Sequence, residues 1–566
     1  MDTASKARTL VRLRLNLRWT EARLLTAVTI GLLLVTSLPC AYGYLSCPED
    51  KWFSGVVYNV HDTAQYLSWM REAGTSLLTD NKLTAEPNAR IFINLHWWIL
   101  GRLAHMFGLT LPQGYQLFRV LAVPLLALAT YAFCATLFSS RRQRWCAFLL
   151  STFTSGLGWI WVVTKYTTGQ FNFPHDVYTT PGNAFWMMIA SPHLTFAAAL
   201  TLGVLLLALL SVRKQRLDYA LGSGALALFL GMGHIYDLVT IWTVLALFGL
   251  LLTLRDGWTR KTFLSLASVV FISAPAAVYW AWVSSDAHPA WQQALAQYDN
   301  LGAFTPAPPH LLVLLGIAFL LALATFDGLV PLKRHADGLL LIKCWFIIVP
   351  FLVYLPVRFQ IMLLTAYNVP VGVLATVGLF DHIMPWLRER LPGSQLSRWV
   401  TERRLRQVLP VMLLVAVSLT NLYLLAWRVY DLSRHDHPFY LDRDETAALQ
   451  WLEEHTAPDE VMLSSLVVGH FIPGLTGDRA FLGSGVMTLD FHRKQAMVEA
   501  FFDPATSDSE RQALIRTYGI RHVFQGSAER EMGSYDPESL TCLTAAYRNR
   551  SVTVFVVDND CSQMGD

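Results

Sequence analysis

Long apolar runs recur along this sequence, and they restrict its fold more than any other feature. The first run covers residues 24–44, and ten more lie at about 112–139, 145–164, 190–212, 217–233, 237–254, 262–283, 309–326, 338–356, 362–382 and 408–428. A helix needs about 20 apolar residues to cross the hydrocarbon core of a bilayer. Hydrophobic residues make up 54% of the 566 and charged residues only 15%, which excludes a disordered, collagen-like or coiled-coil chain. The sequence therefore predicts a polytopic α-helical membrane protein with about eleven transmembrane helices, the first retained as a span rather than cleaved as a signal peptide.

The basic residues indicate how these helices are oriented. Clusters of Lys and Arg lie in alternate connections, at 6–23, 141–144, 213–216, 255–261, 333–334 and 388–406. Cytoplasmic connections carry an excess of Lys and Arg, so we expect all six clusters in the cytoplasm. The connections 45–111, 165–189, 234–236, 284–308 and 357–361 then lie outside. The prediction is an integral plasma (inner) membrane protein with a cytoplasmic N-terminus.

The stretch 217–254 is apolar enough to form either one long helix or a hairpin of two helices. Basic clusters flank it on both sides, and a single span would place one of them outside. We therefore expect a hairpin that turns at residues 231–237.

The charge balance divides the chain into two parts. Residues 1–428 hold 33 basic and 19 acidic residues, whereas residues 429–566 hold 11 and 22. In the second part, helical patterns at 444–455, 490–502 and 507–518 alternate with short strand patterns at 461–468, 480–482, 520–525 and 552–557. The prediction is a transmembrane domain, 1–428, followed by a small extracytoplasmic α/β domain, 429–566.

Seven cysteines are present, and two pairs of them fall on the predicted outer side, where disulfides are permitted. Cys40 and Cys47 flank the outer end of the first span, and Cys542 and Cys561 lie in the second domain. Each pair is either a disulfide or two free thiols. The sequence contains no Gly-rich phosphate loop, Ser–His–Asp elbow or zinc spacing, so we expect no cofactor; no motif supports a divalent metal, and nothing points to a nucleic acid partner.

The segment 45–111, called the outer segment below, carries two helical patterns, at 63–73 and 91–107. Both have apolar residues at helical spacing, and the second carries them on one stripe, so we expect two amphipathic helices lying on the outer membrane surface. Ordinary packing against other loops explains the same pattern. We keep both interpretations open.

Three compact polar clusters lie on the predicted outer side: Asn59-Val60-His61-Asp62, Pro174-His175-Asp176 and His234-Ile235-Tyr236-Asp237. Ionisable groups near the edge of a bilayer are costly and tend to be paired or functional, so we expect the clusters to share one cavity. Each also has a structural explanation. Asp62 and Asp237 precede or begin helices and are suited to capping them, and His193 in Ser191-Pro192-His193 fits a helix start.

Arg358 is the single basic residue of the outward turn 357–361. Its side chain either reaches to the lipid headgroups or clamps a lipid phosphate through its planar fork.

This layout resembles the GT-C-type integral-membrane glycosyltransferases, which use sugars carried on polyprenyl phosphate. The resemblance rests on a first span followed by a large outer segment with an aspartate (here Asp62) and two helices, and on a second outer connection with His175 and Asp176. Kinked spans follow, and a small domain containing the segment 474–483 closes the chain. No Asp-x-Asp motif lies in the first outer segment.

The resemblance implies an inverting sugar transfer on the outer side of the membrane. Asp62 would be the general base for an acceptor hydroxyl of unknown identity, and Arg358 would neutralise the leaving phosphate. His61, His175, Asp176, His193, His234, Tyr236 and Asp237 would bind or position the substrates. The partners implied are the bilayer and a polyprenyl-phosphate-linked sugar.

Two other classes of function fit the same membrane layout. A lipid or solute transporter or flippase would lack covalent chemistry, but such folds often show paired repeats, and none is found in this sequence. A non-catalytic GT-C-like scaffold for envelope assembly is the other alternative. An outward cavity that contains Asp62 beside Arg358 and joins a lateral lipid groove favours the enzyme, whereas a path open to both faces favours transport.

Overall fold

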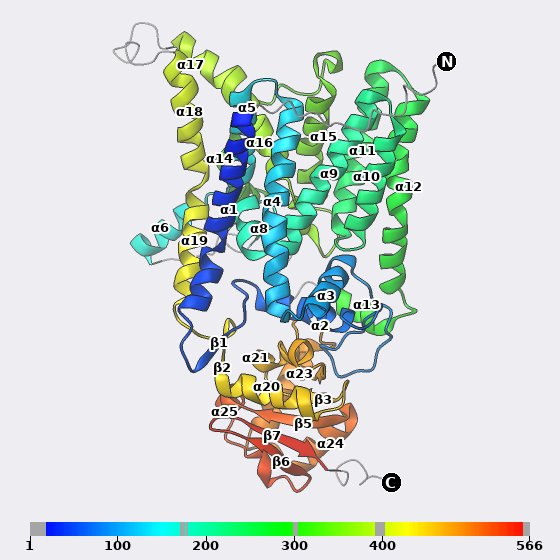
Figure 1. The fold of residues 1–566 in the computed structure, drawn as a ribbon, viewed down its shortest axis with the longest axis vertical. Helices are drawn as coiled ribbons and strands as arrows, with labels where there is room; N and C mark the ends of the chain where they lie inside the picture. Colours follow the sequence, from blue (N-terminus) through cyan, green and yellow to red (C-terminus); the bar gives the residue numbers. More distant parts are fainter. Residues whose placement is uncertain (1–18, 170–175, 177–178, 298–303, 391–401, 559–566) are drawn as a thin grey trace.

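A computed structural model describes residues 19–169, 176, 179–297, 304–390 and 402–558. The molecule is elongated, with a helix bundle at one end and a β-sheet domain at the other (Figure 1). The outer segment lies between them. This arrangement places the outer segment in contact with both parts of the chain.

Six stretches of the bundle are long and apolar enough to cross a membrane. They are α1 (Trp19–Leu45), α4 (Leu111–Leu137), α9 (Pro192–Lys214), α11 (Tyr236–Asp256), α12 (Arg260–Val283) and the run Gln360–Arg390, which comprises η3 (Gln360–Leu364), α16 (Asn368–Val377), η4 (Gly378–Ile383) and α17 (Met384–Arg390). Two bent pairs raise the number to eight: α5 (Arg141–Phe153) with α6 (Gly158–Thr168), and α18 (Glu402–Val417) with α19 (Leu419–Leu432).

Three further apolar helices are shorter than a typical span: α10 (Leu217–Gly231), α14 (Pro308–Ala324) and α15 (Asp337–Leu352). Each of the eleven predicted runs contains one of the helices or helix pairs named so far. Because α10, α14 and α15 have only 15 to 17 residues, the count of eleven spans stays a prediction.

The predicted hairpin between residues 217 and 254 is confirmed. Helix α10 ends at Gly231, and α11 begins at Tyr236 after a short turn. The two helices run side by side in Figure 1. The turn brings His234 and Asp237 to the end of the bundle that faces the outer segment.

The outer segment contains β1 (Lys51–Phe53), α2 (Val60–Ala73) and α3 (Leu95–Phe107). Helix α2 is buried on most sides, so it does not lie on a membrane surface. Helix α3 buries Trp97 and Leu100 and exposes Ile99 and Phe107, which fits the predicted surface helix. The short helix α13 (Pro289–Ala296) lies beside α3 in this layer, whereas α8 (Ala184–Ala190) lies within the bundle and packs on α9 (Figure 1). The turn η2 (Leu332–Arg334) lies near the last turn of α11, where Arg255 donates to the carbonyl of His335.

The last part of the chain forms a five-stranded mixed sheet in the order β4-β3-β5-β7-β6. Its strands are β3 (Val461–Leu463), β4 (Arg479–Ala480), β5 (Ile520–Gln525), β6 (Leu543–Arg548) and β7 (Thr553–Val557). The central strand β5 pairs in parallel with β3 and antiparallel with β7. The helices around it are α20 (Arg443–His455), α21 (Leu466–Gly469), α22 (Ile472–Leu475), α23 (Phe491–Phe502), α24 (Asp508–Tyr518), α25 (Ser527–Met532) and η6 (Pro537–Ser539). The α/β alternation expected from the sequence is present, with β6 as the strand that it did not predict.

Strand pairing joins this sheet domain to the outer segment at two places. Strand β2 (Tyr440–Asp442) pairs antiparallel with β1, and Thr84 forms an isolated antiparallel bridge with Leu482. Helix α22 packs on α2, where a Cβ added at Gly474 would lie 3.1 Å from the Cβ of Leu67. The sheet domain therefore fixes the position of α2.

The cysteines differ between the two predicted pairs. Cys40 lies within α1 and is a buried free thiol, and Cys47 is also free, so this pair is not a disulfide. Cys542 is disulfide-bonded. Cys561 lies outside the described residues.

Candidate functional site at the outer end of the bundle

A cavity of about 490 Å³, called the central cavity below, lies where the outer segment meets the bundle. Its walls come from α2, α3, α9 and α11, with contributions from the η3 turn. Polar and aromatic side chains line it: Tyr58, Asn59, Asp62, Gln65, Tyr66, Trp69, Asn94, Trp97, Tyr115, Thr179, Thr180, Ser191, His193, His234, Tyr236 and Trp280. The sequence predicted four of these residues, namely Asp62, His193, His234 and Tyr236.

Asp62 lies in the first turn of α2, but it does not cap this helix. Asn59 is the N-cap residue; its backbone has φ 48°, and its side-chain oxygen accepts the backbone N–H of Asp62. The Asn59 amide also donates to Oδ2 of Asp62 at 2.7 Å. Burial raises the pKa of Asp62 to about 6, while this hydrogen bond opposes the rise. The cavity thus contains a carboxylate that takes up a proton close to neutral pH.

His234 and Asp237 form a pair at the start of α11. Nδ1 of His234 lies 2.8 Å from Oδ2 of Asp237. His234 lines the cavity, whereas Asp237 is almost fully buried behind it. Since Nδ1 faces this carboxylate, Nε2 is the nitrogen of His234 that is left for a ligand. Asp237 therefore orients the imidazole rather than contacting the cavity.

His193 lies in the first turn of α9, on the wall next to His234. Its Nε2 is 3.4 Å from the hydroxyl of Tyr66, and its ring centre is 6.2 Å from that of His234. Tyr66 stacks on Trp97 with ring centres 4.3 Å apart. These aromatic faces are suited to packing against a sugar ring or a lipid chain.

Several lining residues were not predicted from the sequence. Asn59 and Asn94 are N-caps of α2 and α3, and the Asn94 amide also donates to the Gly233 carbonyl at 2.7 Å. Tyr66 follows from the helical pattern of α2 only as a packing residue. An asparagine just before a helical pattern is a capping signal, and it would have found both asparagines.

The expectation that all three polar clusters share one cavity is wrong for three described residues, of which Asp237 lies behind His234 as described above. His61 is on another face of α2, where its ring meets that of His470 edge-on at 4.2 Å. Asp176 is buried between α6 and α19, and it accepts the backbone N–H of Gly158 at 2.7 Å. His175 lies outside the described residues.

Arg358 does not line the central cavity either. It is exposed, and its guanidinium donates to the carbonyl of Ala296. Ile361 and Met362, which follow it in the η3 turn, do line the cavity. Arg358 thus precedes the nearest cavity-lining residue, Ile361, by three positions in the sequence.

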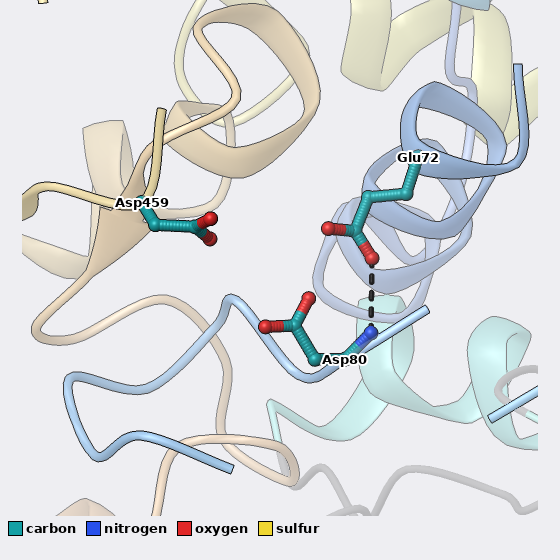
Figure 2. A group of neighbouring side chains, drawn as sticks. All are labelled: Glu72, Asp80 and Asp459. Carbon is teal, nitrogen blue, oxygen red and sulfur yellow. Dashed lines mark hydrogen bonds between the residues drawn. The ribbon is translucent and has the colours of Figure 1, made fainter. Parts of the chain in front are cut away.

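Three carboxylates gather away from the cavity, where α2 meets the sheet domain: Glu72, Asp80 and Asp459 (Figure 2). Their oxygens lie within 4.8 Å of one another, which is close enough for a metal ion. Cations already pair with them: Lys82 lies 3.3 Å from Glu72 and 3.1 Å from Asp459, and Arg479 pairs with Asp80. We call these five residues the ion-pair network.

The acids of this network differ in their protonation. Burial, together with the neighbouring Asp80, raises the pKa of Glu72 to about 7. The pKa of Asp80 is lowered despite burial, because Glu72 hydrogen-bonds to it and Arg479 stabilises its charge. Lysine and arginine thus compensate the acidic charge here, and the arrangement is that of a structural junction.

The chain was compared with known proteins. No family model matches it, and no curated protein matches its sequence. Among solved structures, the Archaeoglobus fulgidus oligosaccharyltransferase in the apo form has a TM-score of 0.55 at 12% identity and covers 90% of this chain and 70% of that one. The archaeal oligosaccharyltransferase AglB with an inhibitory peptide and a dolichol-phosphate has a TM-score of 0.53 at 12% identity, with the same coverage. The mycobacterial arabinofuranosyltransferase AftD has a TM-score of 0.53 at 13% identity and covers 95% of this chain and 40% of that one.

Proposed function

Because the chain has the fold of the GT-C glycosyltransferases, as its sequence predicted, we propose that it is itself a membrane glycosyltransferase. It moves a sugar from a polyprenyl-phosphate carrier to an acceptor hydroxyl on the extracytoplasmic side. The observation that carries this proposal is the position of Asp62, a carboxylate facing a polar, aromatic-lined cavity at one end of a membrane bundle.

In the proposed reaction, Asp62 acts as general base. It takes the proton of the acceptor hydroxyl while that oxygen attacks the anomeric carbon of the sugar. The bond between this carbon and the phosphate oxygen breaks, and the electron pair leaves with the phosphate. Attack from the face opposite the phosphate inverts the anomeric configuration.

The walls of the cavity support a lipid-linked donor. Polar groups lie next to the apolar side chains of Leu194, Ile235, Ile361 and Met362. A donor with a sugar, a phosphate and a polyprenyl tail needs both kinds of surface, because the tail stays dissolved in the bilayer. Arg358 is proposed to neutralise phosphate charge at the edge of this site.

The test is sugar transfer from polyprenyl-phosphate sugars in membranes that contain the full chain. We expect Asp62→Asn to lower turnover by about 100-fold or more at normal expression, because loss of a general base costs on the order of 10²–10⁴ in rate. The matched control is Asp286→Asn, an exposed aspartate outside the cavity, which is expected to leave turnover unchanged. Full activity of Asp62→Asn would eliminate Asp62 as the base.

Arg358→Ala tests the second role separately. We expect a higher KM for the donor and little change in the KM for the acceptor. An unchanged dependence on donor concentration would remove Arg358 from phosphate binding.

A further inference from the structure

The charges around the central cavity restrict the donor that it accepts. Among the described residues that line it, none is a lysine or arginine, and Asp62 is the only carboxylate. The other ionisable lining groups are His193, His234 and four tyrosines. Within the described lining, a phosphate therefore finds positive charge only on a histidine, and Arg358, which does not line the cavity, keeps its proposed role at the edge of the site.

The two lining histidines are not equivalent. His234 has the buried carboxylate of Asp237 on Nδ1, at 2.8 Å. A carboxylate in this position stabilises the imidazolium form and fixes the ring, so that Nε2 is presented to a ligand. His193 has a tyrosine hydroxyl near Nε2, and its buried Nδ1 has no hydrogen-bond partner among the described residues. Of the two lining histidines, His234 is thus the one whose carboxylate partner would stabilise a positive charge on the ring.

We propose that the lipid donor carries a single phosphate, and that Nε2 of His234 binds this phosphate and protonates it as the sugar leaves. This inference rests on the proposed function and specifies its donor. As the carbon–oxygen bond breaks, the electron pair moves to the phosphate oxygen, which takes the proton from Nε2. Asp62 meanwhile holds the proton of the acceptor. Loss of this proton to solvent and uptake of one by His234 restore the starting state.

A diphosphate donor fits this site less well. It carries at least one more negative charge, and proteins usually neutralise such groups with arginine and lysine clusters or with a divalent cation held by several carboxylates. The described part of the lining offers one carboxylate and no such cluster. The three carboxylates of the ion-pair network lie elsewhere, with Lys82 and Arg479 already paired to them.

Binding of sugar-free probes tests the proposal without requiring transfer. Farnesyl phosphate and farnesyl diphosphate differ only in the second phosphate, and their affinity for the purified full chain in nanodiscs is measured by titration calorimetry. We expect the wild type to bind farnesyl phosphate at least as tightly as farnesyl diphosphate. His234→Ala is expected to bind farnesyl phosphate about 10-fold more weakly or worse, the size of a lost charged hydrogen bond. The control His105→Ala removes an exposed histidine of α3 outside the cavity and is expected to bind like the wild type.

Asp237 is a positioning residue, and rescue by the conservative variant separates its effect from folding. Asp237→Asn is expected to weaken farnesyl phosphate binding and to lower kcat, each by about 10-fold, because the amide no longer favours the imidazolium form of His234. Asp237→Glu is expected to restore part of both. Wild-type affinity and kcat for Asp237→Asn, or no recovery by Asp237→Glu, would contradict the positioning role.

Three results would overturn the proposal: a wild type that binds neither probe, His234→Ala with wild-type affinity, or a preference of more than about 10-fold for the diphosphate. These results are distinct from failure of the proposed function. If Asp62-dependent transfer persists while His234→Ala binds normally, the transferase stands and another group holds the phosphate. If no polyprenyl donor supports transfer, the transferase is lost whatever the probes show.

Discussion

Asp62 is a carboxylate whose pKa is raised to about 6 by burial, against the effect of the Asn59 hydrogen bond. A general base acts in its ionised form, so the acid limb of the pH profile should rise through about pH 6. Asn59→Ala removes the hydrogen bond that favours the ionised form, and the rise should move to higher pH. The measurement is kcat/KM for sugar transfer between about pH 5 and 9. A rise that stays in place when Asn59 is changed would show that another group titrates.

The residues of the site were predictable from the sequence where they are ionisable. Asp62, His193 and His234 were found because ionisable groups at the edge of a bilayer are costly and are therefore usually paired or functional. The cluster argument failed for His61 because neighbouring residues of a helix point about 100° apart, so His61 and Asp62 face different surroundings. Asp176 was misplaced because its partners, Gly158 and Thr420, are distant in sequence and give no local signal.

The position of helix α2 depends on contacts with other parts of the chain. The ion-pair network connects it, and the loop after it, to the sheet domain, and Arg71 donates to the Leu475 carbonyl of α22 at 2.9 Å. The Arg479–Asp80 pair is nearly buried, with side chains 10% and 5% exposed. Since α2 also carries Asp62, loosening this junction should displace the proposed general base.

Arg479→Met should therefore destabilise the protein and also lower its activity. Removing one partner of a buried ion pair costs about 3–5 kcal/mol when the other charge is left uncompensated. Asp80 keeps a longer pair with Arg90 at 3.7 Å, so we expect a cost of about 3 kcal/mol, at the low end of this range. The matched control is Arg548→Met, which breaks an exposed pair with Glu538 (55% and 50% exposed) and should cost less than about 1 kcal/mol. Thermal unfolding and sugar transfer by the two variants are compared. Equal effects of the two substitutions would show that the junction does not hold α2.

The elements themselves followed from periodicity and length. Every predicted apolar run contains helix, and the hairpin at 217–254 followed from charge alone. Burial of α2 was not predictable, because α22, which covers one face of α2, lies about 400 residues away in the sequence. Strand β6 was missed since Ala545 and Ala546 give its centre little strand preference.

For the whole molecule, the prediction concerns which end of the helix bundle faces the cytoplasm. The basic ends of α5 and α17 lie at one end of the bundle, and α2, α3 and the sheet domain lie at the other (Figure 1). The positive-inside rule favours the cytoplasm for the first end, so we predict that the central cavity and the sheet domain are extracytoplasmic. A lipid-linked donor would then be consumed on the outer side of the membrane.

Single cysteines at exposed positions test this orientation in intact cells with a membrane-impermeant maleimide. Glu531→Cys, in α25 of the sheet domain, should be labelled without permeabilisation, and Arg334→Cys, in η2, only after it. The unmodified chain is the control for its own free thiols, of which Cys47 is only half-buried. Labelling in the reverse pattern would place the cavity in the cytoplasm, where the positive-inside argument does not allow it. Asp62 would then face the side on which nucleotide-linked sugars are available, and a polyprenyl carrier would no longer be required.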